Sequence, residues 1–175
     1  PMSGLGSRFA DAGYKEIKPL IPVMGKPIVE WVCDLFPGAD DFLFVCREAH
    51  LETTNLREEL QRIRPDGKIV SIPGHKLGPV YAVHCVADMI GDDEEVVVNY
   101  CDFFMDWDFV DFRNTMQHNS CAGAIPCYTG FHPHLLHPEN VYAVCLANDS
   151  MHMKDIKEKH RFDPDPEKDY HSAGT

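Results

Sequence analysis

Short apolar runs alternate with amphipathic segments between residues 28 and 99. Three runs have the character of strands, and they occupy residues 42–46, 68–72 and 95–99. The last run contains no polar alternation, so we expect it to be buried on both faces of a sheet. Helices are predicted around these strands, at residues 28–36, 50–63 and 80–90. This order predicts a parallel sheet covered by helices, which is an α/β fold.

The pattern changes after residue 120. Residues 122–128 and 140–147 resemble longer strands, separated by a loop at residues 129–134 that contains glycine and proline. We expect the α/β core to continue here into a half with a mixed sheet. No internal repeat or low-complexity linker interrupts the chain, so residues 1–175 are predicted to form a single domain.

Composition agrees with a globular protein. A chain of 175 residues, of which 44% are hydrophobic, buries a substantial core without disulfides or a structural metal. The seven cysteines include no Cys-x-x-Cys pair, and their odd number indicates reduced thiols in the cytosol. The sequence shows neither a signal peptide nor an apolar stretch of membrane-spanning length. We therefore expect a cytoplasmic location.

The formal net charge of −12 at pH 7 repels nucleic acid and anionic membranes over most of the surface. Residues 1–26 are an exception, because four cations outnumber two carboxylates there: Arg8, Lys15, Lys18 and Lys26 against Asp11 and Glu16. This distribution favours a small anionic ligand near the N-terminus and predicts no nucleic-acid or membrane partner.

The exceptional segment contains the features of a phosphate-binding loop. Gly4 and Gly6 permit a tight turn in which backbone N–H groups approach phosphate oxygens, and Ser7 adds a hydroxyl donor. Arg8 supplies a planar fork suited to phosphate. Lys18 and Lys26 follow, each before a proline that favours extended backbone at the lysine. We expect these three cations to converge on one anion.

Two common glycine motifs do not fit this segment. A dinucleotide-binding fingerprint requires a third glycine where Phe9 stands, and a Walker loop requires a Gly-Lys-Ser/Thr sequence that is absent. Gly-x-Gly alone is a weak signal, whereas the combination with Arg8, Lys18 and Lys26 is far more specific.

The complete pattern resembles the sugar-phosphate nucleotidyltransferases, the nucleotide-sugar pyrophosphorylase family. The resemblance begins with residues 4–9 (GLGSRF), residues 18–23 (KPLIPV) and residues 25–27 (GKP). Later segments agree in the same order: residues 96–102 (VVVNYCD), Glu158-Lys159, and residues 172–175 (SAGT). His160 and Ser172 depart from the family, which has proline and asparagine at these positions.

The resemblance implies a Rossmann-like, three-layer fold with a mixed, mostly parallel central sheet. It implies that an NMP group passes from a nucleoside triphosphate to a sugar 1-phosphate, with Mg²⁺ as cofactor and pyrophosphate as leaving group. Arg8 and Lys18 are then the catalytic cations, Asp102 binds the metal, and Glu158, Lys159 and Gly174 bind the acceptor. The predicted nucleotide-binding residues are Gly4, Leu5, Gly6, Ser7, Gly78 and Pro79.

Asp102 is also a candidate on position alone. Ligands of open α/β sheets lie beyond the carboxyl ends of the strands, and Asp102 follows the predicted strand at residues 95–99. Its alternative role is the cap of a helix that begins near Phe103, and Asp106 and Asp108 are nearby alternative ligands. A zinc site at His132, His134 and His137 is less favoured than a turn or substrate loop, because Pro133 and Pro138 break the spacing.

Both ends of the chain lack a segment that we expect for this fold. A phosphate loop at residues 3–8 should follow an apolar strand, yet the chain begins at Pro1, and it ends at Thr175 within a segment that the resemblance makes a strand. We expect the first strand and a C-terminal part to lie outside this sequence.

The sequence is also compatible with three other functions. They are a cytidylyltransferase for a phosphorylated alcohol such as phosphocholine, a glycosyltransferase that uses the Asp106-x-Asp108 motif, and a non-catalytic nucleotide-binding module. The resemblance points to polysaccharide precursors as the product class and is compatible with a homo-oligomer.

Overall fold

The computed structural model describes residues 1–119, 121–140 and 142–174. Contacts divide the chain into two compact units, Pro1–Asn114 and Thr115–Thr175. Over the described residues, no helix combines the length and the apolar character needed to cross a bilayer.

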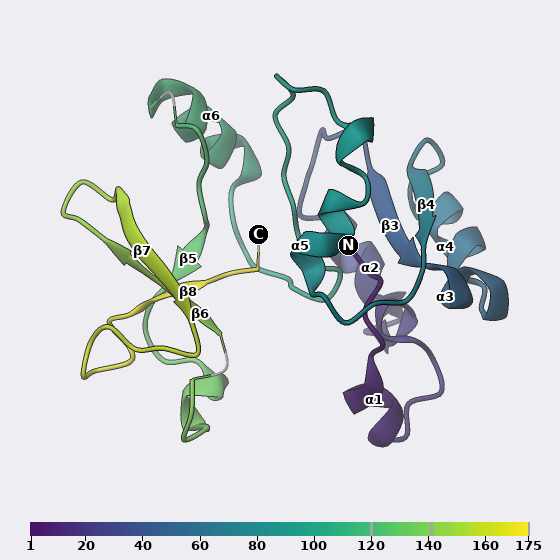
Figure 1. Ribbon diagram of the computed structural model, residues 1–175, viewed down its shortest axis with the longest axis horizontal. Helices are drawn as coiled ribbons and strands as arrows, with labels where there is room; N and C mark the ends of the chain where they lie inside the picture. Colours follow the sequence, from purple (N-terminus) through teal and green to yellow (C-terminus); the bar gives the residue numbers. More distant parts are fainter. Residues whose placement is uncertain (120, 141, 175) are drawn as a thin grey trace. The chain divides into compact units, whose positions relative to one another are not determined.

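The first unit contains short helices and two small sheets. Its elements in chain order are α1 (Ser7–Asp11), η1 (Lys18–Leu20), β1 (Pro22–Val23), β2 (Lys26–Pro27), α2 (Ile28–Cys33), β3 (Leu43–Arg47), α3 (Glu48–Thr53), α4 (Leu56–Ile63), β4 (Lys68–Ile72), α5 (Pro79–His84) and η2 (Ala87–Met89). The two sheets are β1-β2 and β3-β4. Figure 1 shows β3 and β4 side by side. Helix α6 (Phe109–Asn119) begins in this unit and ends in the second.

Strands β3 and β4 form the parallel sheet that the sequence predicts. Their register runs from Leu43 opposite Lys68 to Arg47 opposite Ile72. Met2 lies on the other edge of β3, where it forms a parallel bridge with Cys46 and its N–H donates to the Val45 carbonyl at 2.7 Å. This bridge anchors the N-terminal segment just before the glycine loop.

The alternation of side chains along β3 builds two cores. Phe44 and Cys46 point to one face, where they pack with residues of α2 and α4, including Val29, Leu56 and Leu60. Val45 points to the opposite face and packs with Ile72, Ala82 and Val86. Helices therefore cover both faces of the sheet, as the predicted three-layer α/β arrangement requires.

Two predicted helices are broken in the structure. The segment predicted as a helix at residues 50–63 forms α3 and α4, because Thr54 adopts extended backbone and its hydroxyl contacts the His50 carbonyl and the Leu56 N–H. Such side-chain bonds compete with the helical hydrogen bonds. The segment predicted at residues 80–90 divides similarly into α5 and η2.

The prediction of a buried strand at residues 95–99 is wrong. In the described chain these residues have no strand partner, and Val96, Val97 and Val98 are 49%, 43% and 39% exposed. An apolar run favours a strand only where a neighbouring backbone completes its hydrogen bonds. Here β3 pairs with β4 on one edge and with Met2 on the other.

The second unit contains one antiparallel sheet of order β5-β8-β6-β7. Its strands are β5 (Cys127–Tyr128), β6 (Ala143–Ala147), β7 (Met153–Glu158) and β8 (Tyr170–Ser172), and η3 (Pro133–Leu136) follows β5. The strand predicted at residues 122–128 shortens to β5, and the sheet of this unit is antiparallel rather than mixed. Residue 141, within the other predicted strand, lies outside the described residues.

Candidate active site

A cavity of about 650 Å³ opens beside the glycine loop in the first unit. This volume lies in the range of small-molecule and cofactor sites, roughly 300–1,000 Å³. Five segments line it, and the residues are Pro1 to Arg8; Lys18 and Pro19; His50; His75, Lys76, Gly78 and Pro79; and Tyr100, Cys101 and Asp102. The predicted catalytic, nucleotide-binding and metal-binding residues of the first unit therefore all line one cavity.

The glycine loop turns sharply at Gly6. Gly6 has φ 64° and ψ 22°, a left-handed conformation that favours glycine, and α1 begins at the next residue. The Gly6 carbonyl accepts the Phe9 N–H at 3.0 Å. The N–H groups of the first helical turn, at Ser7 and Arg8, have no carbonyl within the helix to pair with. The turn therefore presents backbone donors next to the Arg8 side chain.

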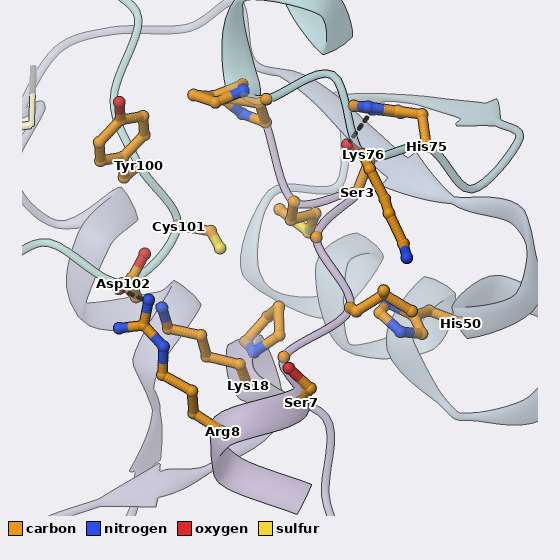
Figure 2. Close-up of a pocket in the computed structure, with 18 residues that line it drawn as sticks. Ser3, Ser7, Arg8, Lys18, His50, His75, Lys76, Tyr100, Cys101 and Asp102 are labelled. Atoms are coloured by element: carbon orange, nitrogen blue, oxygen red, sulfur yellow. Dashed lines mark hydrogen bonds and ion pairs between the residues drawn. The ribbon is translucent and has the colours of Figure 1, made fainter.

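Two cations and one carboxylate meet at one end of the cavity. Lys18 Nζ lies 2.5 Å from Asp102 Oδ2, and their side chains are 29% and 34% exposed. Figure 2 shows the Arg8 and Lys18 side chains extending toward Asp102. The same Lys18 ammonium lies 5.3 Å from the centre of the Phe9 ring. The cluster keeps two positive charges near a carboxylate, a charge pattern suited to a metal-bound polyphosphate.

Lys26 does not join this cluster, contrary to the expected convergence of three cations. It forms ion pairs with Asp34 and Glu30, and its ammonium lies 4.3 Å from the centre of the Trp31 ring. The carboxylates of α2 hold Lys26 at that helix, and Lys26 is not among the residues that line the cavity.

The alternatives to Asp102 are placed differently. In the described chain no helix begins near Phe103, so Asp102 is not a helix cap. Asp108 takes that role instead, because its Oδ1 accepts the Asp111 N–H at 2.9 Å at the start of α6. Neither Asp106 nor Asp108 lines the cavity.

A second group of residues closes the other side of the cavity. Ser3, which is 4% exposed, shares a hydrogen bond of 2.9 Å with His75 Nε2. His75 begins the loop before α5, and Gly78 ends that loop with φ 84° and ψ 176°, a conformation open to glycine. Figure 2 shows the Lys76 side chain extending toward His50. Ser3 and His50 were not singled out from sequence, although His50 follows β3 at the carboxyl end, where ligands of α/β sheets lie.

Burial controls the protonation of two lining residues. Burial, followed by the nearby Asp102 charge, raises the pKa of the Cys101 thiol to about 11, so this thiol stays protonated at neutral pH. Burial and the neighbouring Arg47 charge lower the pKa of His50, which favours its neutral form. Neither group adds charge to the cavity at neutral pH, and the lysine and arginine side chains that line it are Arg8, Lys18 and Lys76.

The predicted acceptor residues lie in the second unit. Glu158 ends β7 opposite Ala143, and Lys159 follows with φ 54°, its N–H donating to the Tyr142 carbonyl at 3.0 Å. The Gly174 N–H donates to the Ser172 hydroxyl at 3.4 Å. Thr175, the last residue of the predicted SAGT segment, lies outside the described residues.

A family model described as a MobA-like NTP transferase domain matches residues 2–161. The chain belongs to this family. The resemblance to sugar-phosphate nucleotidyltransferases is thereby confirmed, and the matched range includes every cavity-lining residue except Pro1, together with Glu158 and Lys159. A comparison with curated protein sequences found no match.

Solved structures show the same fold at low sequence identity. A nucleoside-diphosphate-sugar pyrophosphorylase from Vibrio cholerae RC9 is 18% identical, with a TM-score of 0.70 over 99% of this chain and 69% of that chain. A UDP-glucose pyrophosphorylase complexed with UDP-glucose is 17% identical, with a TM-score of 0.69 over 99% and 72%. The inositol-1-phosphate CTP transferase from T. maritima is 15% identical, with a TM-score of 0.63 over 98% and 65%. The fold is the Rossmann-like nucleotidyltransferase fold expected from the sequence.

Proposed function

We propose that this protein transfers an NMP group from a nucleoside triphosphate to a sugar 1-phosphate, forming an NDP-sugar and pyrophosphate. The observation that carries the proposal is the position of Arg8, Lys18 and Asp102 at one end of a cavity lined by the glycine loop. Family membership supports transfer from a nucleoside triphosphate. The sugar phosphate rests on the sequence resemblance and on the nature of the two pyrophosphorylases that share the fold.

The reaction needs positioning and charge neutralisation more than a catalytic base. A phosphate oxygen of the acceptor attacks the α-phosphorus, the bond from that phosphorus to the bridging β-oxygen breaks, and pyrophosphate leaves in line. The attacking phosphate is largely ionised near neutral pH, since its second pKa is about 6. No side chain therefore has to remove a proton, and holding the reactants in line provides much of the acceleration.

The residues of the first unit divide these tasks. Arg8 binds the leaving pyrophosphate through its planar fork, and Lys18 binds the triphosphate as a point charge. Gly4, Leu5, Gly78 and Pro79 frame the base and ribose, while Gly6 and Ser7 provide donors to the phosphates. In the second unit, Lys159 binds the acceptor phosphate, and Glu158 and Gly174 contact the sugar.

The donor set fits Mg²⁺ as cofactor. Mg²⁺ is usually held by one or two carboxylates together with substrate phosphates and water. Asp102 offers such a carboxylate in the cavity, and no group of three or more ligating side chains that could hold a metal occurs among the described residues. Asp102 would therefore hold the ion only together with the triphosphate, where the ion offsets charge on the phosphates. Lys18, which is paired with Asp102, would then be available to contact the phosphates.

A second candidate is transfer of a cytidylyl group to a phosphorylated alcohol. The inositol-1-phosphate CTP transferase, which shares this fold, supports this second candidate. A glycosyltransferase based on Asp106-x-Asp108 is less favoured, because Asp108 caps α6 and neither carboxylate lines the cavity.

Pyrophosphate release tests these proposals directly. The protein is assayed with Mg²⁺ and each of CTP, UTP, GTP, ATP and dTTP, in the presence of sugar phosphates, inositol 1-phosphate or phosphocholine. We expect release that requires one nucleotide and one acceptor, and the acceptor distinguishes the sugar-phosphate enzyme from the alcohol-phosphate enzyme. Tight nucleotide binding without pyrophosphate release would instead indicate a non-catalytic module.

A further inference from the structure

One hydrogen bond joins two loops that line the same part of the cavity. Ser3 immediately precedes the glycine loop, and His75 lies 72 residues later, between β4 and α5. The Ser3 hydroxyl and His75 Nε2 are 2.9 Å apart, at a partly buried position. Figure 2 shows this bond as a dashed line between the two labelled residues.

The hydrogen-bond partners of His75 define its tautomer. The Leu77 N–H donates to His75 Nδ1 at 3.3 Å, so Nδ1 is an acceptor and carries no hydrogen. The ring hydrogen is therefore on Nε2, which donates to the Ser3 hydroxyl oxygen. Both ring nitrogens are used for positioning, one toward each loop.

Each end of this contact is anchored. On one side, Met2 holds the segment before Ser3 against β3 through its bridge to Cys46. On the other side, the His75 ring packs edge-on against Tyr81 of α5, with ring centres 4.8 Å apart. The residues between His75 and Tyr81, at positions 76–80, are exposed. His75 is therefore the polar side chain that connects this loop to the glycine loop.

We propose that His75 is a positioning residue for the nucleotide, which sets the separation of the two loops through its hydrogen bond to Ser3. This inference rests on the proposed function, in which Gly4 and Leu5 frame the nucleotide from one side and Gly78 and Pro79 from the other. Without the bond, the loop at residues 75–79 samples other positions, and nucleotide binding must restore the productive one. Loss of the bond therefore lowers the affinity for the nucleotide and leaves the rate of the chemical step unchanged.

Steady-state kinetics provide the first test. With whichever of CTP, UTP, GTP, ATP and dTTP the wild type uses, we expect His75→Ala to raise the nucleotide KM about threefold to tenfold, the effect of one net hydrogen bond. The kcat at saturating nucleotide should stay within about twofold, because the residues placed on the reacting phosphates are unchanged. His75→Gln, which retains a donor and an acceptor, should recover most of the affinity.

A double-mutant cycle identifies the partner. Ser3→Ala and the Ser3→Ala/His75→Ala pair should both resemble His75→Ala, because each removes the same bond. His84→Ala is the matched control, since His84 is an exposed histidine of α5 that does not line the cavity. Additive effects of the two single variants, an unchanged nucleotide KM in His75→Ala, or an equal effect of His84→Ala would each overturn the inference.

Hydrogen exchange tests the link without any nucleotide. In the ligand-free protein, His75→Ala should speed amide exchange in the peptides that contain Leu77–Val80 and Ser3–Arg8, whereas His84→Ala should not. Unchanged exchange in both peptides would refute the connection between the loops. A wild-type protein that shows this coupling but releases no pyrophosphate would contradict the proposed function alone.

Discussion

Replacing Asp102 with asparagine separates a structural role from a catalytic one. In the ligand-free protein, Asp102 is bonded to Lys18 at 2.5 Å, and the two side chains are 34% and 29% exposed. Water screens a pair with this exposure, so the pair contributes only about 0–1 kcal/mol to the free energy of unfolding. For a chain of this length, 1 kcal/mol corresponds to a change in Tm of roughly 2–4 °C.

The effect on catalysis should be much larger. Asp102 is the one carboxylate among the residues that line the cavity. If it holds Mg²⁺ on the triphosphate, Asp102→Asn removes the negative charge that binds the ion. The loss of one such preorganised electrostatic interaction lowers kcat on the order of 10²- to 10³-fold. We expect this loss at a fixed Mg²⁺ concentration, and we expect partial recovery as Mg²⁺ is raised.

Two measurements on the same samples compare the effect of Asp102→Asn on stability with its effect on catalysis. Thermal unfolding without ligands gives the change in Tm, and pyrophosphate release across a Mg²⁺ titration gives kcat and the apparent metal affinity. Asp106→Asn serves as the comparison variant, since Asp106 is a nearby carboxylate outside the cavity lining. Unchanged kcat and metal dependence in Asp102→Asn would refute the metal role and leave Asp102 as the partner of Lys18. A loss of activity confined to Asp106→Asn would transfer the role to that residue.

Three further predictions concern the site, the core and the response to pH. Arg8→Ala should lower turnover by about 10²-fold or more with little change in Tm, while Lys15→Ala, which removes a charge outside the cavity lining, should not; pyrophosphate release checks both, and wild-type turnover in Arg8→Ala would refute its assignment. Leu60→Ala should lower the free energy of unfolding by about 2–5 kcal/mol in urea, because Leu60 is 0% exposed. Leu136→Ala, at a side chain that is 76% exposed, is the control, and equal losses would contradict the assigned core. Burial, followed by the charges of His171, His132 and Arg161, lowers the pKa of His134 from 6.5 to about 4. The unfolded chain therefore binds more protons between these values, and the free energy of unfolding should fall as the pH is lowered from about 6.5 to about 4. Urea titrations across this range should show a smaller fall in His134→Gln; an identical fall would exclude His134 as its source.

The elements that the sequence predicts well depend on local patterns. The apolar runs at residues 42–46 and 68–72 correspond to β3 and β4 within one residue at each end, and the helix predicted from residue 28 begins there as α2. The glycine loop was also predictable, because Gly6 adopts the left-handed turn that its lack of a Cβ permits. These features depend on each residue and its near neighbours along the chain.

The failed predictions have a common cause. Residues 95–99 have the composition of a strand, but a strand also needs a partner backbone, and composition carries no information about that partner. Lys26 was expected to converge with Arg8 and Lys18 on one anion, yet Glu30 and Asp34 hold it at α2. Asp102 and Asp108 were both candidate ligands until the start of α6 made Asp108 a cap.

By itself, then, the sequence determined the family, the α/β order of the core, and the residue types around a phosphate. The tertiary structure decided which of those residues share a cavity, since the contacts of Lys18 with Asp102 and of Ser3 with His75 join positions far apart in the chain. Local propensity depends on residues that are close in the sequence, whereas an ion pair or a hydrogen bond depends on how close two groups are in space. These groups come close to each other only when β3, β4 and their helices have packed.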